Sequence, residues 1–405
     1  MRKFWLIVIG ILSLLPGHAQ KYADFADAVK RLNDFSAATD TTGLKTQVNQ
    51  WWEMLQAKRQ IPLIVEDSVI FLYRGDAKSI DWMGDFNAWG YRKDFPNKGK
   101  RVQNTNIWFL KCSFPKEARL DYKILIDGSQ WLLDPENSNH QWSGVGGGSP
   151  NSELRMPNWK ADPILTERPG IHRGTLKKDL LFNSKTLGYQ ITYSVYIPYG
   201  IDPKGKYPVL YVTDGYEYML PELGNIVTVL DNLLVDKKIQ PVIAILIDHR
   251  EPINRSNNRR MQELNMSEKY LQFIADEFIP AVESNLPIHH DAAHRAILGA
   301  SMGGLAAAYI AFTRPDLFAM AGIQSPAFWS RPQIYTVCDN PNSQKIKVSM
   351  TSGLINDSSD GSRKMKEILQ NNACVYNYRE TPEGHSWGNW RNLIDDILVD
   401  FFALP

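Results

Sequence analysis

The segment 294–310 constrains the fold of this chain more than any other. It places the pattern G-x-S-x-G, Gly299 to Gly303, between a short apolar run and an alanine-rich one. Ala296–Leu298 is typical of a buried strand end, and Leu305–Phe312 is typical of a helix. The pattern therefore predicts a sharp strand-to-helix turn that projects the hydroxyl of Ser301, with glycines where flanking side chains would clash. A small-residue turn that only packs a helix is the alternative.

The first 19 residues have the layout of a secretory signal. Arg2 and Lys3 precede an apolar run over 4–15, and small residues stand at Gly17 and Ala19, the spacing of a cleavage site. The apolar run is too short for a permanent membrane anchor. We therefore expect 1–19 to be a cleaved signal peptide and the mature protein to be periplasmic or secreted.

Charge and cysteine content exclude several classes of partner. Without the signal, the 45 basic residues fall to 43 against 44 acidic ones, which favours neither nucleic acid nor a membrane surface as partner. Cys112, Cys338 and Cys374 are too few for a disulfide scaffold. Cys338 and Cys374 could pair, or all three could be buried thiols. No Cys/His cluster has metal-ligand spacing, so we expect neither a metal nor a cofactor.

The chain divides by composition into four parts after the signal. Residues 20–62 are polar and helical in pattern, and 63–158 alternate short β-type runs with turn signals such as Asp127-Gly128. These runs predict an all-β sandwich of about immunoglobulin size. A Gly- and Pro-spaced stretch from Gly144 to Gly170 indicates a linker, placed at 159–173 in the domain division.

Strands and helices alternate over 174–405, which predicts an α/β domain with a mainly parallel sheet. The expected strands are 190–197, 209–212, 242–247, 296–298, 320–323, 346–350 and 374–378. The clearest expected helices are 267–285, 304–313 and 361–371. In such a sheet the functional residues follow the carboxyl ends of the strands.

A nucleophilic Ser301 needs a histidine base and an acid that orients it, which in this fold follow the serine in the order acid, histidine. His385 is the one histidine downstream of Ser301, and it lies in a loop after an expected strand. Asp357 and Asp360 both follow the strand at 346–350. We favour Asp357, because Asp360 precedes a helix that it could cap. Glu383, two residues from the histidine, is a weaker rival.

An oxyanion hole is expected from two backbone N–H groups. One belongs to Met302, which follows the serine, and the other to Gly215 or Tyr216 in the loop after the strand at 209–212. Asp214, in the same loop, could be an ordinary turn residue.

The domain over about 174–405 resembles the enterochelin esterase and esterase D group of α/β-hydrolases, which is related to carbohydrate esterase family 1. The resemblance rests on segments in the family's order: 211–215, 247–248, 260–264, 277–280, 299–303, 352–357 and 384–387. It implies Ser301, Asp357 and His385 as a catalytic triad. It also implies that Arg260 and Glu263 shape the substrate pocket, although such a pair could equally be a surface salt bridge.

The block 79–89, with 118–123 and 133–135, resembles the early-set domains that precede such esterases and that are similar to carbohydrate-binding modules. Tryptophans of this region could stack on sugar rings, but tryptophans in strands are more often core residues. The four are Trp82, Trp89, Trp131 and Trp142. The domain could also simply cover one side of the active site, as it does in the similar siderophore esterases.

Together these patterns predict a serine carboxylic-ester hydrolase that forms an acyl-enzyme. Aromatic residues near the expected active-site loops, among them Tyr218, Trp329 and Trp387, suit an aromatic acyl group, such as a siderophore catecholate or a ferulate on a polysaccharide. The expected partner is thus a small-molecule or oligosaccharide ester, and the oligomeric state stays open. The alternatives are an acyltransferase to a sugar hydroxyl and a non-catalytic carbohydrate-binding protein.

Overall fold

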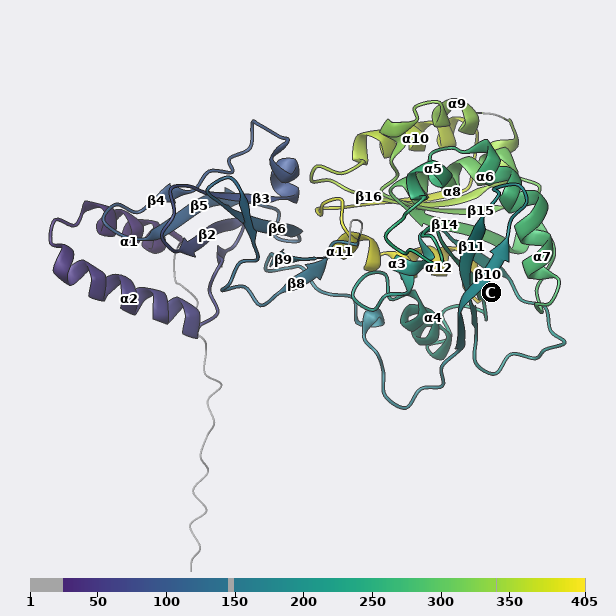
Figure 1. Ribbon diagram of the computed structural model, residues 1–405, viewed down its shortest axis with the longest axis horizontal. Coiled ribbons are helices and arrows are strands. Elements are labelled where there is room, and N and C mark those ends of the chain that lie inside the picture. The colour runs from purple at the N-terminus through teal and green to yellow at the C-terminus, as the bar shows by residue number, and fades with distance from the viewer. Residues whose placement is uncertain (1–24, 145–148, 340, 405) are drawn as a thin grey trace, which may run out of the picture.

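A computed structural model describes residues 25–144, 149–339 and 341–404. The expected signal peptide lies outside these residues. Figure 1 shows two bodies: a smaller one with helices α1 and α2 and the strands β1 to β9, and a larger one in which helices cover a long sheet. The loops at one end of the large sheet meet the smaller body.

Two amphipathic helices cover one face of the smaller body. They are α1 (Phe25–Ala37) and α2 (Thr41–Ala57), and the side chain of Asp40 accepts hydrogen bonds from the first turn of α2. Their apolar faces, including Trp51, Trp52 and Leu55, are buried against Ile70 and Leu72 of the sheet below. Burial of this stripe is what stabilises helices whose outer faces are polar.

The β strands of this body form two packed sheets. One has the order β1-β2-β5-β4 and the other β3-β6-β9-β8, with β7 paired to β6. Phe71, Trp82, Phe86 and Tyr122 fill the space between them. The strand bounds are β1 Leu63–Val65, β2 Ser68–Arg74, β3 Ile80–Gly84, β4 Lys100–Arg101, β5 Ile107–Ser113, β6 Arg119–Ile126, β7 Gln130–Leu132, β8 His140–Trp142 and β9 Pro150–Arg155, and a 3₁₀ turn, η1, spans Asp85–Gly90.

Strand β9 lies inside the stretch 144–170 whose composition indicated a linker, and within the bounds 63–158 predicted for the sandwich. Strand β9 pairs with both β6 and β8, and its Leu154 is fully buried in the sandwich core. Further along, the short turn η2 (Pro163–Leu165) inserts Ile164 into the core of the larger body, where Asn232 donates to its carbonyl. The composition of this stretch, rich in glycine, proline and polar residues, contains little of the apolar alternation that indicates strands.

The larger body has an eight-stranded sheet with the order β10-β11-β13-β12-β14-β15-β16-β17. Strands β10 and β11 are antiparallel to their neighbours, and the pairs from β13 to β17 are parallel. The predicted fold class is confirmed. The bounds are β10 Thr175–Asn183, β11 Gln190–Ile197, β12 Val209–Val212, β13 Ile243–Asp248, β14 Arg295–Ala300, β15 Met320–Gln324, β16 Lys347–Gly353 and β17 Tyr376–Thr381.

Helices pack on both faces of this sheet and bury a separate core on each. On one face lie α6 (Glu268–Gln272), α7 (Ile279–Glu283), α8 (Met302–Thr313), α9 (Ile334–Cys338) and α10 (Ser359–Asn371), and on the other α4 (Ile226–Val235) and α12 (Ile394–Phe402). Shorter elements are α3 Gly215–Met219, α5 Arg260–Leu264, α11 Trp387–Arg391, η4 Ala292–His294, η5 Phe328–Ser330 and η6 Pro341–Lys345. The single helix expected over 267–285 is interrupted by a π-helical segment, η3 (Phe273–Phe278).

The three cysteines are free thiols, so Cys338 and Cys374 do not form a disulfide in this structure. Both are buried, and burial raises the pKa of each thiol.

Candidate active site

Ser301 stands at the turn from β14 into α8 with a strained backbone. Its φ is 57° and its ψ is −116°, a conformation that side-chain-bearing residues rarely adopt. A Cβ at Gly299 would lie 2.3 Å from the carbonyl oxygen of Gly303, and one at Gly303 would lie 2.4 Å from Oγ1 of Thr213. Both glycines are therefore required for close approach of the strand, the helix and the β12 loop.

The structure brings Ser301, His385 and Asp357 into one hydrogen-bonded row. Nε2 of His385 is 2.9 Å from Oγ of Ser301, and Nδ1 of His385 is 2.6 Å from Oδ1 of Asp357. Asp357 is buried, whereas the His385 side chain is 29% exposed. A buried carboxylate that binds Nδ1–H leaves Nε2 free to accept the serine proton, so the row can activate the hydroxyl as a nucleophile.

The second oxygen of Asp357 is also fully engaged. Ser325 donates its hydroxyl to Oδ2 at 2.6 Å, and the backbone N–H of Gly353 donates to it at 2.5 Å. Burial by itself would raise the pKa of Asp357, but His385 and these hydrogen bonds outweigh it and hold that pKa below its ordinary value. The group is therefore a carboxylate at neutral pH.

The two rival acids lie elsewhere. Asp360 is fully exposed in the first turn of α10, where it faces Arg363. Glu383 is buried and accepts a hydrogen bond from Trp159. Of the three acids, Asp357 is the one whose carboxylate is hydrogen-bonded to the histidine ring.

The amides expected to form an oxyanion hole both begin helices. Met302 is the first residue of α8 and Gly215 is the first residue of α3, so their N–H groups lie among those without intrahelical acceptors. Arg260 joins the two loops, because it donates to Asp214 at 2.7 Å and to the carbonyl of Ala300 at 3.1 Å. It ties the β12 loop to the serine turn.

Three of the residues expected to contact the substrate have side chains that are buried and bound to other side chains of the protein. Glu263 is buried and accepts from Tyr189 at 2.8 Å, while its other oxygen is 2.5 Å from Nδ1 of His249. Tyr218 is fully buried and donates to Gln324, so the expectation that it faces the substrate was wrong. Trp387 is 1% exposed and packs edge-on against Tyr218, so direct contact with an acyl group was likewise a wrong expectation. The reason is burial: both rings fill the core below the loops.

Trp329 has a different position, because it is 63% exposed and its ring lies 5.7 Å from that of His385. It lines a cavity of about 330 Å³ together with Phe328 and Asp357. Trp329 therefore borders both this cavity and the histidine ring. Of the tryptophans considered for sugar stacking, Trp82 is a core residue, whereas Trp131 and Trp142 are 50% and 40% exposed.

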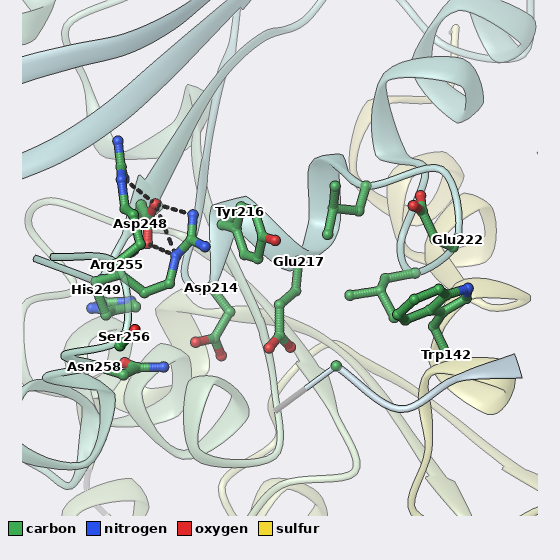
Figure 2. A pocket seen from close by; sticks show the side chains of 14 residues that line it. Trp142, Asp214, Tyr216, Glu217, Glu222, Asp248, His249, Arg255, Ser256 and Asn258 are labelled. Atoms are coloured by element: carbon green, nitrogen blue, oxygen red, sulfur yellow. Dashed lines mark hydrogen bonds and ion pairs between the residues drawn. The ribbon is translucent and has the colours of Figure 1, made fainter. Parts of the chain in front are cut away.

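A larger cavity of about 650 Å³ adjoins the β12 loop and is rich in carboxylates (Figure 2). Asp214 and Glu217 point into it from one side, and Trp142 of the β sandwich borders it on another. Arg250 and Arg255 both bind Asp248, so the two cations outnumber this carboxylate, and Asp214 is paired with Arg260. Burial, with the nearby Asp214, raises the pKa of Glu217 to about 7.

Sequence reasoning missed Ser325 and Glu217. Ser325 follows the carboxyl end of β15, next to the strand that carries the serine, and this position was a usable signal for it. Glu217 accepts a hydrogen bond from Nε1 of Trp387, 170 residues away, and nothing local indicates that contact.

Two further observations concern metals and membranes. His289, Asp291 and His294 gather at the opposite end of β14, with one possible ligand atom of each within 4.8 Å of the others. This group is a difference from the expectation that no Cys/His cluster has metal-ligand spacing. Within the part of the chain that the structure describes, no helix combines the length and apolarity needed to cross a bilayer.

Comparison with known proteins now places the chain. Residues 184–401 match a family model named Esterase, described as "Putative esterase". The endo-1,4-β-xylanase/feruloyl esterase of Xylanibacter ruminicola is 30% identical over 236 residues, which is 56% of this chain but 31% of that protein. The iron(III) salmochelin esterase of Escherichia coli O6:H1 is 24% identical over 75% of this chain and 80% of its own length.

Solved structures agree on the fold. The ferric enterobactin esterase of Salmonella typhimurium superposes with a TM-score of 0.68 at 18% identity, covering 82% of this chain and 93% of that one. The enterobactin esterase of Shigella flexneri gives 0.66 at 18% identity, over 82% and 92%. Since the family match covers more than half of the chain, this protein belongs to the Esterase family and is a carboxylic-ester hydrolase.

Proposed function

We propose that Ser301, His385 and Asp357 form the catalytic triad and that hydrolysis passes through an acyl-enzyme. The observation that carries the proposal is the row of two hydrogen bonds, 2.9 Å from Ser301 to Nε2 and 2.6 Å from Nδ1 to Asp357. The strained backbone of Ser301 supports it, because such strain persists at sites where geometry serves function.

In this mechanism His385 takes the Ser301 proton at Nε2 while Oγ attacks the ester carbonyl. The amides of Met302 and of Gly215 or Tyr216 stabilise the oxyanion, and Asp357 balances the positive imidazolium. His385 then gives its proton to the leaving alcohol, which departs as the carbon–oxygen bond breaks. Water, deprotonated by the same histidine, then attacks the acyl carbonyl. The bond from the acyl carbon to Oγ breaks as the acid leaves, and His385 returns its proton to Oγ.

For the substrate we propose an ester of an aromatic acid, with Trp329 and Phe328 beside the acyl group. The first candidate is a feruloyl ester of a polysaccharide, supported by the similarity to the xylanase/feruloyl esterase. A siderophore ester is the second candidate, supported by the salmochelin esterase similarity.

The test is hydrolysis by wild type and Ser301→Ala of p-nitrophenyl acetate, methyl ferulate, an acetylated xylan oligosaccharide and a tricatecholate siderophore. We expect loss of the serine to reduce kcat to background, on the order of 10⁶-fold in comparable triads. Equal slow rates in both proteins would refute the assignment. Products formed with an added alcohol acceptor distinguish hydrolysis from acyl transfer.

We also propose export through a cleaved signal at 1–19, on the sequence pattern alone. Expression of the full chain in a bacterium with two compartments tests it. A periplasmic protein whose N-terminus is Gln20 is expected, and an uncleaved cytoplasmic chain would contradict the proposal.

A further inference from the structure

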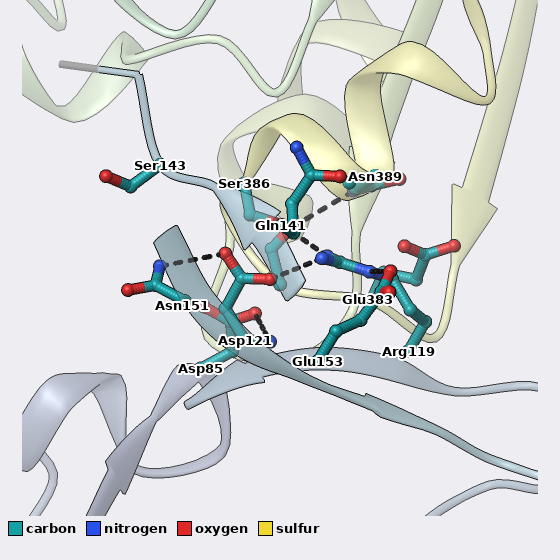
Figure 3. A network of polar contacts seen from close by, with 12 residues as sticks. Asp85, Arg119, Asp121, Gln141, Ser143, Asn151, Glu153, Glu383, Ser386 and Asn389 are labelled. Carbon is teal, nitrogen blue, oxygen red and sulfur yellow. Dashed lines mark hydrogen bonds and ion pairs between the residues drawn. The ribbon is translucent and has the colours of Figure 1, made fainter. Parts of the chain in front are cut away.

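The β sandwich meets the larger body at the two loops that hold Asp357 and His385. Figure 3 shows the polar contacts between Arg119 of the sandwich and the loop that carries Glu383 and Ser386. One is the loop 354–358 after β16, and the other is the loop 382–386 after β17. Side chains or backbone atoms of η1 and β6 of the sandwich hold both loops.

The histidine loop is held through Arg119 of β6, whose side chain is fully buried. Its guanidinium donates to Glu153 at 2.6 Å and to Asp121 within the sandwich, and to Oγ of Ser386, the residue after the histidine, at 3.0 Å. A Cβ at Gly388 would lie 1.9 Å from this guanidinium, so the first turn of α11 sits directly on it. A planar fork bound on both sides fixes the position of its acceptors.

The aspartate loop is held through Asn356, the residue before the triad acid. Its side-chain amide donates to the carbonyls of Asp85 and Phe86 in η1, at 2.8 and 3.0 Å, and its oxygen accepts from Arg92 at 3.2 Å. Ile355 packs against the sandwich core. Residues from both bodies therefore surround the segment that carries the acid.

The two loops are also joined to each other beside the sandwich. The N–H of Ile355 donates to the carbonyl of Glu383 at 3.0 Å, and that of Leu354 to Thr381 at 2.8 Å. A Cβ at Gly384 would lie 2.3 Å from the carboxyl carbon of Asp85. The loops and η1 thus form one close-packed layer, in which a shift of the sandwich would move the acid and the base together.

From these contacts we infer that the β sandwich is a positioning element of the active site. Arg119 of the sandwich holds the loop of His385, and Asn356, which binds η1 of the sandwich, holds the loop of Asp357. Both loops are thereby kept in register with Ser301. The inference rests on the proposed triad. Positioning matters because a displacement of about 1 Å at reacting groups can cost roughly 100-fold in rate. On this account Arg119 and Asn356 act through the triad residues and touch no substrate.

The test uses two mild variants of the full chain, since loss of Arg119 could unfold it. Asn356→Gly removes the side-chain contacts while keeping a backbone φ of 50° that glycine adopts freely, and Ser386→Ala removes the acceptor of Arg119. There are two controls. Asn104→Gly changes an exposed position of the sandwich whose φ is 60°, and Ser284→Ala changes an exposed serine directly after α7.

We expect kcat for methyl ferulate to fall roughly 10- to 100-fold in both variants and KM to stay within about two-fold. Labelling of Ser301 by a fluorophosphonate should slow in parallel, and amide hydrogen exchange over 353–358 and 381–388 should quicken. The controls should show none of these changes.

Unchanged exchange together with unchanged kcat would overturn the inference, and so would faster exchange without loss of kcat. If the wild type neither hydrolyses esters nor takes the label, the proposed function fails. The exchange data then still decide whether the sandwich holds the two loops.

Discussion

Two buried polar clusters lie side by side in this protein and differ in how completely their groups are bound. In the cluster of Ser301, His385 and Asp357, the acid is buried but the histidine is 29% exposed, so one end of the row meets solvent. In the cluster around Arg119, the guanidinium is fully buried and bound by two carboxylates and a hydroxyl. The first cluster is therefore open to solvent on one side, whereas the guanidinium of the second is enclosed by its partners.

The largest expected effect comes from breaking the first cluster at its buried end. Asp357→Asn keeps the shape of the acid but removes the negative charge that fixes the Nδ1–H tautomer and stabilises the imidazolium, so we expect kcat to fall roughly 10⁴-fold. The neighbouring Asp360→Asn, at a fully exposed side chain, is the matched control and should leave kcat unchanged. A loss in Asp360→Asn instead would show that the acid has been misassigned.

Breaking the second cluster should cost stability first. Arg119→Met leaves Asp121 and Glu153 buried without their cation, and removing one partner of a buried ion pair costs about 3–5 kcal/mol. Arg314→Met breaks an exposed ion pair with Asp316 and should cost about 1 kcal/mol or less. Urea unfolding followed by tryptophan fluorescence measures both. Equal costs would show that the buried cluster adds nothing to stability.

Glu383 lies between the two clusters, and its carboxyl makes the free energy of unfolding depend on pH. Burial, partly offset by Arg119, raises the pKa of its carboxyl to about 7. A raised pKa means that its contribution to stability is complete below the unfolded-state value near 4.5 and is lost as the pH rises through 7.

We therefore expect the free energy of unfolding to fall less steeply between pH 4.5 and 8 in Glu383→Gln than in wild type. The difference should reach roughly 3 kcal/mol at pH 8, because each pKa unit corresponds to about 1.4 kcal/mol. Glu53→Gln, on an exposed face of α2, should reproduce the wild-type slope. Parallel slopes in all three proteins would mean that Glu383 is not neutral in the folded state.

The contrast between the clusters also explains what the sequence could predict. Strand β12 was predicted with its observed bounds, and the turn at Ser301 was predicted from its flanking glycines. Both features depend on residues that are adjacent in the sequence. Strand β10 escaped notice because it is a charged edge strand, Thr175–Asn183. Arg119 and Ser386 are 267 residues apart, and no local pattern connects them. Tyr218 and Trp387 were assigned to the substrate because their loops adjoin the site, but their rings pack against each other in the core.

The smallest expected effect tests the exposed side of the proposed triad. Trp329 is exposed beside His385, and an aromatic contact there contributes about 0.5–1.5 kcal/mol. Trp329→Ala should therefore raise KM for methyl ferulate roughly 3- to 10-fold and leave hydrolysis of p-nitrophenyl acetate unchanged. Trp131→Ala removes an equally exposed ring from the β sandwich and should affect neither ester. If Trp131→Ala raised KM for a feruloylated polysaccharide but not for methyl ferulate, the sandwich would bind sugar in addition to holding the catalytic loops. Equal KM values for methyl ferulate in wild type and Trp329→Ala would place the acyl group elsewhere, with the carboxylate-rich cavity as the remaining site.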